Sequence, residues 1–111
     1  MDKRKSVKVN KRYFKIAKDF ADIVENNGYR ISELHIFGSR LTGINTKWSD
    51  LDLCLVTTDL KRDRLAEAVK FTLLGRKVSD LIEPHLMSPA DFDNRYNLLA
   101  KEVKKTGVRV I

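Results

Sequence analysis

The chain has 111 residues, of which 42% are hydrophobic and 33% charged, and its 22 Lys and Arg against 15 Asp and Glu give a formal charge of +7. This length and composition predict one folded domain with an apolar core and exclude disordered and collagen-like chains. No apolar stretch approaches the roughly 20 residues of a membrane span, no apolar signal segment follows Met1, and the single cysteine excludes an internal disulfide, so we expect a cytoplasmic chain with no membrane contact.

The positive charge is concentrated near the N-terminus. Residues 1–18 carry eight Lys or Arg against one acid, Asp2. We expect a basic arm over residues 1–10 and a single domain over residues 11–111. A basic arm is typical of segments that bind phosphates or an acidic partner, and also of solvated segments that only aid solubility. Both alternatives stay open.

The first elements follow from the spacing of apolar residues. Three- and four-residue spacing predicts an amphipathic helix over residues 11–26, ended by an Asn-Asn-Gly sequence. The apolar run over residues 31–37 predicts a short, largely buried strand that closes at a Gly-Ser pair. Ser39 is expected to cap a short helical turn through Thr42, and residues 43–47 are expected to form a loop.

The clearest strand covers residues 48–56. Its alternation separates two faces, with Leu51, Leu53 and Leu55 on one and Asp50, Asp52 and Cys54 on the other. Asp59 is expected to cap the next helix, which should stop at Gly75. The apolar positions of that helix that follow the helical period are Leu65, Ala66, Val69, Leu73 and Leu74.

The last third of the chain predicts a strand within residues 78–87 and then a helix capped by Ser88, with Pro89 at its first position, continuing or restarting through Lys104. A Thr-Gly pair breaks that helix, and residues 108–111 form a terminal strand candidate. The order of these elements predicts a small α/β or α+β sheet with helices packed on one face.

Two carboxylates on one face of an apolar strand need a physical reason. Asp50 and Asp52 are two residues apart, so their side chains point to the same side of the strand. There the two carboxylates repel each other and lose solvation, and a cation bound between them would offset both costs. Oxygen ligands of this kind suit Mg²⁺, which completes its shell with water and phosphate oxygens. An isolated Asp-x-Asp is more typical of an exposed sheet face, so it decides nothing by itself.

A second feature lies twelve positions before Asp50. Gly38 and Ser39 leave a strand and enter a helical turn, which provides the free backbone N–H groups and the hydroxyl that cradle phosphates. Arg40 and Lys47 add positive charge in the same loop. Together with the paired carboxylates, these residues predict a site for a metal and a triphosphate.

The two features together resemble a known signature. Gly38-Ser39, ten further residues and Asp50-Leu51-Asp52 match the G-S-x10-D-x-D pattern of the DNA polymerase β-like nucleotidyltransferase superfamily, and Phe37 through Leu53 looks especially like the minimal nucleotidyltransferases of bacteria and archaea. The resemblance implies a small mixed β-sheet flanked by helices, two Mg²⁺ ions, and transfer of a nucleoside monophosphate from an NTP to a hydroxyl. It implies that Gly38 and Ser39 hold the triphosphate and that Asp50 and Asp52 hold the metals.

The superfamily uses a third carboxylate from a neighbouring strand, and two residues compete for this role. Glu83 on the metal side turns Ile82 into the core, whereas Asp80 on that side turns Ile82 out, which costs on the order of 1.5–3 kcal/mol. We therefore favour Glu83. Asp80 stays open as the alternative, because an Asp followed by two apolar residues is the more usual family pattern.

His85 follows close behind in sequence. A lone histidine near a strand end is more typical of a structural or solvated side chain, so we do not include it in the predicted site. Cys54 shares the carboxylate face, but no neighbouring residue would activate it, so we expect a small buried side chain.

The resemblance implies an enzyme whose acceptor must come from elsewhere, because 111 residues leave no room for an acceptor-binding domain. For minimal members it implies a separately encoded helical HEPN-type partner in a toxin-antitoxin pair, with AMP from ATP moved to a Tyr of that partner; an RNA acceptor is the other option. The alternative function is a catalytically weak nucleotide- or RNA-binding module of the same fold.

Overall fold

We analysed a computed structural model that describes residues 10–38 and 50–111. The predicted basic arm lies outside these residues, apart from Asn10. So do the predicted helical turn and loop between the two described ranges, and with them Ser39, Arg40 and Lys47 of the predicted triphosphate site. The first residues of the strand predicted over 48–56 are outside as well.

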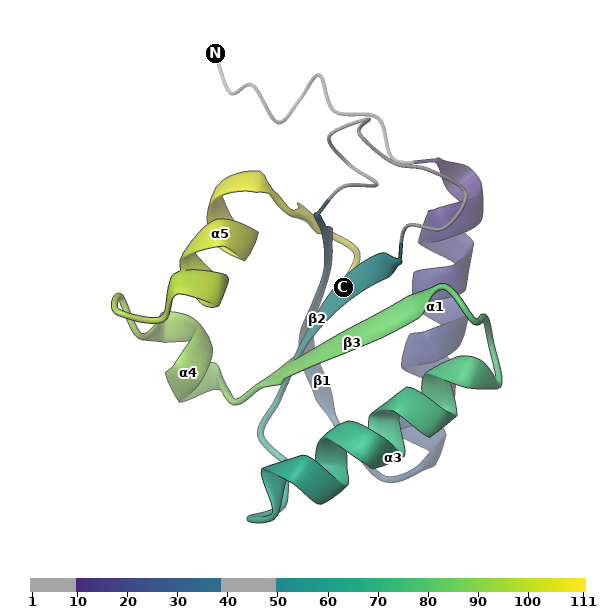
Figure 1. The fold of residues 1–111 in the computed structure, drawn as a ribbon, viewed down its shortest axis with the longest axis horizontal. Coiled ribbons are helices and arrows are strands. Elements are labelled where there is room, and N and C mark those ends of the chain that lie inside the picture. Colours follow the sequence, from purple (N-terminus) through teal and green to yellow (C-terminus); the bar gives the residue numbers. More distant parts are fainter. Residues whose placement is uncertain (1–9, 39–49) are drawn as a thin grey trace.

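The described residues form helices on a mixed sheet (Figure 1). In chain order the elements are α1 (Lys11–Asn26), β1 (Ile31–Phe37), β2 (Leu51–Thr57), α3 (Arg64–Arg76), β3 (Ile82–Met87), α4 (Pro89–Asp93), α5 (Leu98–Thr106) and β4 (Val108–Arg109). The strand order is β3-β2-β1-β4, in which β2 and β3 run parallel and the other neighbours antiparallel. The predicted small mixed sheet with flanking helices is confirmed. No helix in the two described ranges has the length and apolar character needed to span a membrane.

One face of the sheet carries the main core. Its β2 side chains are Leu51, Leu53 and Leu55, as the alternation predicted, and none of the three is exposed. Helix α1 covers this face with Phe20 and Val24 among its buried residues, and α3 adds Phe71. The predicted bounds of α1 and β1 are confirmed. The helical period of α1 and the apolar run of β1 both lie within the element itself, so they can be recognised without knowing its tertiary contacts.

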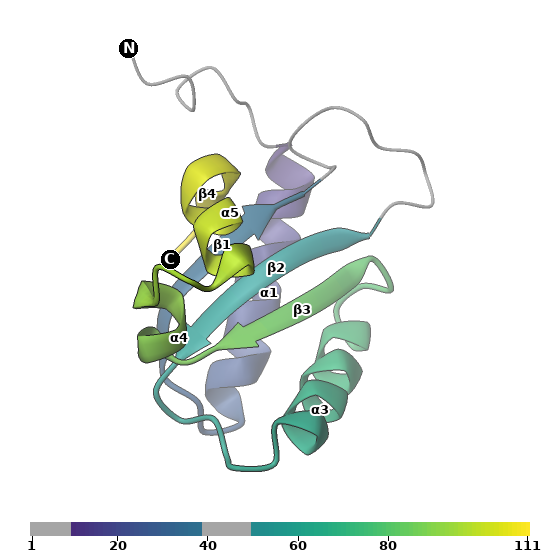
Figure 2. The same cartoon turned by 60° about the vertical axis from the view of Figure 1, so that its left-hand side comes forward.

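The opposite face carries a smaller core, and here one prediction is wrong. The helices do not all pack on one face: Phe92 of α4 and Ala100 and Val103 of α5 pack against a second cluster that contains Cys54 and Val56 of β2. Figure 2 shows α4 and α5 on the side of the sheet opposite α1. A second layer forms because Cys54, Val56 and Met87 are also apolar, so both sheet faces at this end must be covered.

Helix α3 begins later than predicted. Asp63, not Asp59, caps it, and its side chain accepts a hydrogen bond from the backbone N–H of Ala66 at 3.0 Å. Asp59 instead accepts hydrogen bonds from the backbone N–H of Arg30 at 2.7 Å and from its guanidinium. This partner lies 29 residues away in sequence, so the choice between the two capping acids depends on tertiary structure.

Most of the apolar positions predicted for α3 do not lie on its buried face. Leu65, Val69 and Leu73 are 77%, 53% and 60% exposed, and of the predicted positions only Leu74 is buried, together with Phe71 and Gly75. A Cβ at Gly75 would lie 3.0 Å from a methyl carbon of Ile82, so glycine allows the helix to approach β3 closely.

The buried face of α3 is held by a polar contact. Glu67 is only 4% exposed and accepts hydrogen bonds from the Tyr29 hydroxyl at 2.8 and 2.9 Å and from the Lys61 backbone N–H at 3.2 Å. These bonds satisfy a carboxylate that would otherwise be costly to bury.

The C-terminal third matches the predictions more closely. Strand β3 lies within the expected range, and Ser88 caps α4 with Pro89 in its first turn. The final helix restarts rather than continues, because Asn97 caps α5 separately and accepts from the Ala100 N–H at 3.0 Å. The terminal strand is shorter than predicted and pairs with β1 at the edge of the sheet.

Candidate active site

The candidate site is built on two adjacent parallel strands. In the β2–β3 register, Asp52 lies opposite Glu83 and Cys54 lies opposite His85. Because side chains alternate along a strand, Asp52, Glu83 and His85 all point to the same face of the sheet. Their neighbours Leu51 and Ile82 also lie opposite each other, and both are buried in the main core on the other face.

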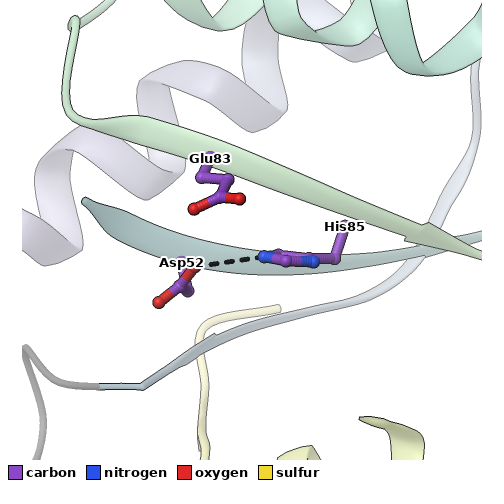
Figure 3. Close-up of side chains that lie close together, drawn as sticks. All are labelled: Asp52, Glu83 and His85. Atoms are coloured by element: carbon purple, nitrogen blue, oxygen red, sulfur yellow. Dashed lines mark hydrogen bonds and ion pairs between the residues drawn. The ribbon is translucent and has the colours of Figure 1, made fainter.

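These three side chains converge at one point (Figure 3). One ligand atom from each residue, a carboxylate oxygen or an imidazole nitrogen, lies within 4.8 Å of the other two. Within this group, Nε2 of His85 lies 3.1 Å from Oδ1 of Asp52. Asp52 and His85 are half-buried and Glu83 is exposed, so the group is reachable from solvent on one side.

Glu83 lies in an acidic environment. Its pKa is raised above the ordinary value, first by partial burial, next by its hydrogen bond with Asp50 and by the charge of Asp52, while His85 acts in the opposite direction. Asp50 is therefore next to Glu83, although it is not part of the convergent group. Three acids in such proximity favour an additional cation, because each one raises the cost of ionising the others.

Gly38 shapes the end of β1 beside Asp52. Phe37, the last residue of β1, pairs with Asp52, and Gly38 follows with φ +89°, a backbone conformation that L side chains rarely adopt. A Cβ at this position would overlap the Asp52 carboxylate and lie 3.2 Å from its Cγ. Glycine is therefore required here both by the backbone and by the closeness of the carboxylate.

The residues fit a divalent cation. Two carboxylates and an imidazole offer oxygen and nitrogen ligands at one point, and the absent Cβ of Gly38 leaves room for the Asp52 carboxylate. Carboxylates are the usual protein ligands of Mg²⁺, and imidazole extends the choice toward transition-metal ions.

Asp80, the alternative third carboxylate, lies elsewhere. It precedes β3, is exposed, and does not belong to the convergent group found among the described residues. It lines a neighbouring hollow of ≈ 360 Å³ together with Asp50, Glu83 and Arg76 of α3. The structure thus brings Glu83, and not Asp80, next to Asp52.

His85 is the site residue that sequence reasoning missed. Its position two residues after Glu83 on a strand could have indicated its place in the site, because this spacing puts both side chains on the same face of the strand. The ring packs edge-on against Phe37, with ring centroids 5.1 Å apart, and this contact holds the imidazole over the start of β2.

Cys54 shares the face of the carboxylates but is not exposed at all, as expected for a small core residue. Burial raises the pKa of its thiol to about 12, so it stays protonated near neutral pH and is a poor nucleophile.

Comparison with known proteins agrees with this arrangement. The family described as "Poly(A) RNA polymerase, mitochondrial-like, central palm domain" matches residues 2–85 of the chain. The chain belongs to this family. The matched range contains all of β2 and the first four residues of β3, and it ends at His85.

A solved structure supports the fold of the palm domain. A Sulfolobus solfataricus protein that carries the provisional name nucleotidyltransferase matches with a TM-score of 0.61 and 21% identity, covering 88% of this chain and 78% of that one. No curated protein matches the sequence. Family and fold together place the palm domain in the DNA polymerase β-like nucleotidyltransferase superfamily, as the sequence motif indicated.

Proposed function

We propose that this palm domain is a Mg²⁺-dependent nucleotidyltransferase that moves a nucleoside monophosphate to a hydroxyl on a protein or RNA acceptor. ATP is the expected donor, and AMP the expected transferred group. The observation that carries the proposal is the position of Asp52 beside Glu83 on parallel strands, next to the Gly38 turn. Carboxylates are the usual protein ligands of Mg²⁺, and a glycine with positive φ at the end of a strand is typical of the backbone that approaches phosphates.

The proposed metal ligands are Asp50, Asp52 and Glu83. Divalent cations, when bound, stabilise negative charge on phosphate oxygens and lower the pKa of a coordinated hydroxyl. Two Mg²⁺ ions are expected, as in the superfamily that the sequence resembles. The pKa of Glu83 is raised first by partial burial and then by Asp50 and Asp52, and a cation would offset the contribution of these neighbouring acids, which supports the assignment.

The proposed triphosphate ligands are Gly38, Ser39, Arg40 and Lys47. Gly38 supports this role, since its positive φ and missing side chain let the end of β1 approach Asp52 closely. We assign backbone N–H donation to the Gly-Ser pair, a hydroxyl hydrogen bond to Ser39, and neutralisation of phosphate charge to Arg40 and Lys47.

The proposed reaction is an in-line displacement at the α-phosphorus. The acceptor oxygen forms a bond to that phosphorus, the bond to the bridging oxygen of the β-phosphate breaks, and pyrophosphate leaves with the electron pair. We assign Glu83 as the group that accepts the hydroxyl proton. Its position opposite Asp52 on the neighbouring strand, in the convergent group, supports this role.

The acceptor supplies the hydroxyl that attacks the α-phosphorus. We propose a separately encoded helical HEPN-type protein as the partner, with one of its Tyr hydroxyls receiving AMP in a toxin-antitoxin pair. The family description names a poly(A) RNA polymerase, so an RNA 3′ hydroxyl is the second acceptor to test. The basic arm over residues 1–10 is proposed to guide either acceptor through its positive charge.

The proposal is tested by incubating the full chain with α-labelled ATP, Mg²⁺ and, in separate reactions, a co-purified HEPN-type partner or a short RNA. We expect label on one acceptor and pyrophosphate release. Asp52→Ala should reduce labelling by at least about 100-fold, in line with the large effect of removing transition-state charge stabilisation.

Two matched variants separate the competing third carboxylates. Glu83→Gln should abolish labelling, whereas Asp80→Asn should leave it within about twofold, because Asp80 lies outside the convergent group. Labelling that persists in Asp52→Ala would refute the proposed role of this carboxylate. RNA binding with a steep salt dependence and no NTP affinity would instead support the binding-module function.

A further inference from the structure

We propose that Nε2 of His85 is a direct metal ligand beside Asp52 and Glu83, and that this nitrogen makes the site prefer a transition-metal ion such as Mn²⁺ over Mg²⁺. The inference rests on the proposed function, since it concerns the metal of the same site. It departs from the all-carboxylate ligand set that the sequence motif implies.

The spacing of the ligand atoms supports direct binding. In an octahedral site with metal-to-ligand distances near 2.1 Å, adjacent ligand atoms lie about 3.0 Å apart and opposite ones about 4.2 Å apart. Nε2 of His85 and Oδ1 of Asp52 are 3.1 Å apart, which matches an adjacent pair. The 4.8 Å limit for the whole group is slightly wider than an octahedron, and the exposed Glu83 side chain is free to close that difference.

The orientation of the ring supports the same conclusion. His85 lies on the same face of β3 as Glu83, and its ring is held by the edge-on contact with Phe37. In the metal-free protein Nε2 can donate to Asp52; with a metal bound, the ring proton would lie on Nδ1 and the lone pair of Nε2 would be available to the ion. A neutral imidazole then adds a ligand without adding a positive charge among the acids.

The chemistry of the donor set decides the metal. Carboxylate oxygens suit Mg²⁺ and Mn²⁺ about equally well as ligand types, whereas imidazole nitrogen suits first-row transition ions. A site with two carboxylates and one imidazole should therefore bind Mn²⁺ more tightly than Mg²⁺.

The second histidine of the chain offers a matched control. His35 also pairs with a carboxylate, since its Nε2 lies 2.9 Å from Oε1 of Glu33. Among residues 10–38 and 50–111, however, only His85 belongs to a group in which a second carboxylate is close enough to share an ion. Both histidines therefore pair with a carboxylate, but only His85 belongs to the proposed metal site.

The test is pulsed electron paramagnetic resonance of Mn²⁺ bound to the full chain, with and without a non-hydrolysable ATP analogue. We expect a ¹⁴N coupling from a directly bound imidazole, replaced by a ¹⁵N pattern when the chain is made with ¹⁵N-histidine. The coupling should vanish in His85→Gln, which keeps a hydrogen-bond donor near Asp52, and persist in His35→Gln.

Calorimetric titration with Mn²⁺ and with Mg²⁺ gives an independent readout. His85→Gln should weaken Mn²⁺ binding about tenfold or more and change Mg²⁺ binding by no more than about twofold. Bound Mn²⁺ without histidine coupling in the wild-type chain would overturn the inference and leave the proposed function standing. If neither ion binds, even with the ATP analogue, the proposed function fails as well.

Discussion

Gly38 meets two separate requirements, and a pair of glycine variants distinguishes them. Gly28 and Gly38 both have positive φ, 93° and 89°, but a Cβ at Gly28 would meet nothing within 4 Å, whereas one at Gly38 would overlap the Asp52 carboxylate. Both Gly→Ala variants should lower the free energy of unfolding by about 1–2 kcal/mol through backbone strain. Only Gly38→Ala should also lose nucleotidyl transfer, because it displaces Asp52.

Urea denaturation measures the stability of both glycine variants, and the labelling assay measures their activity. Equal activity of the two variants at a temperature where both are folded would contradict the assignment of Gly38 to the site. The structure gives a reason for glycine at position 38 that the sequence motif does not contain. The motif predicts close approach of a phosphate, and the structure shows close approach of Asp52.

Helix α3 presents its leucine stripe to solvent, and substitutions on its two sides test this orientation. Phe71→Ala should lower the free energy of unfolding by about 3–5 kcal/mol, because it removes a fully buried ring from the main core. Leu73→Ala should change it by no more than about 0.5 kcal/mol, since this side chain is 60% exposed.

Chemical denaturation at neutral pH provides the measurement for both α3 variants. A loss in Leu73→Ala as large as that in Phe71→Ala would show that the helix is rotated relative to the structure. Glu67 is buried on the same face as Phe71, and its hydrogen bonds compensate for the cost of burying a carboxylate there.

Tyr29 joins distant parts of the whole molecule, because its hydroxyl binds Glu67 of α3 across 38 residues of sequence. Burial, and then Glu67, raises the pKa of Tyr29 to about 12 from an ordinary value of 10. A tyrosine whose folded pKa is raised favours the folded state while it is protonated. Its contribution is therefore complete below pH of about 10 and is lost as the pH rises toward about 12.

Tyr29→Phe should lower the free energy of unfolding by about 1–3 kcal/mol near neutral pH, because Glu67 loses a buried donor. The difference between wild type and variant should shrink between pH of about 9 and pH of about 11.5. Urea midpoints at the two pH values measure this change. A difference that grows with pH would contradict the assigned direction of the Tyr29 pKa shift.

The sequence by itself determined the elements and patterns that depend on neighbouring residues. The bounds of α1 and β1, the separation of leucines from carboxylates along β2, and the Ser88 cap of α4 all follow from helical or two-residue periodicity and from local hydrogen bonds. The motif that joins Gly38 to Asp52 also identified the superfamily before any contact was known.

Only the tertiary structure decided which distant residues meet. The parallel register of β3 on β2 brings Glu83 and His85 to Asp52 and leaves Asp80 outside the group. Asp59 likewise binds Arg30, which is distant in sequence, instead of capping α3, and the packing of α3 leaves Leu65, Val69 and Leu73 exposed. Periodicity describes one element at a time, whereas register and burial arise from the pairing of elements, and the ligand set of the candidate site is a product of that pairing.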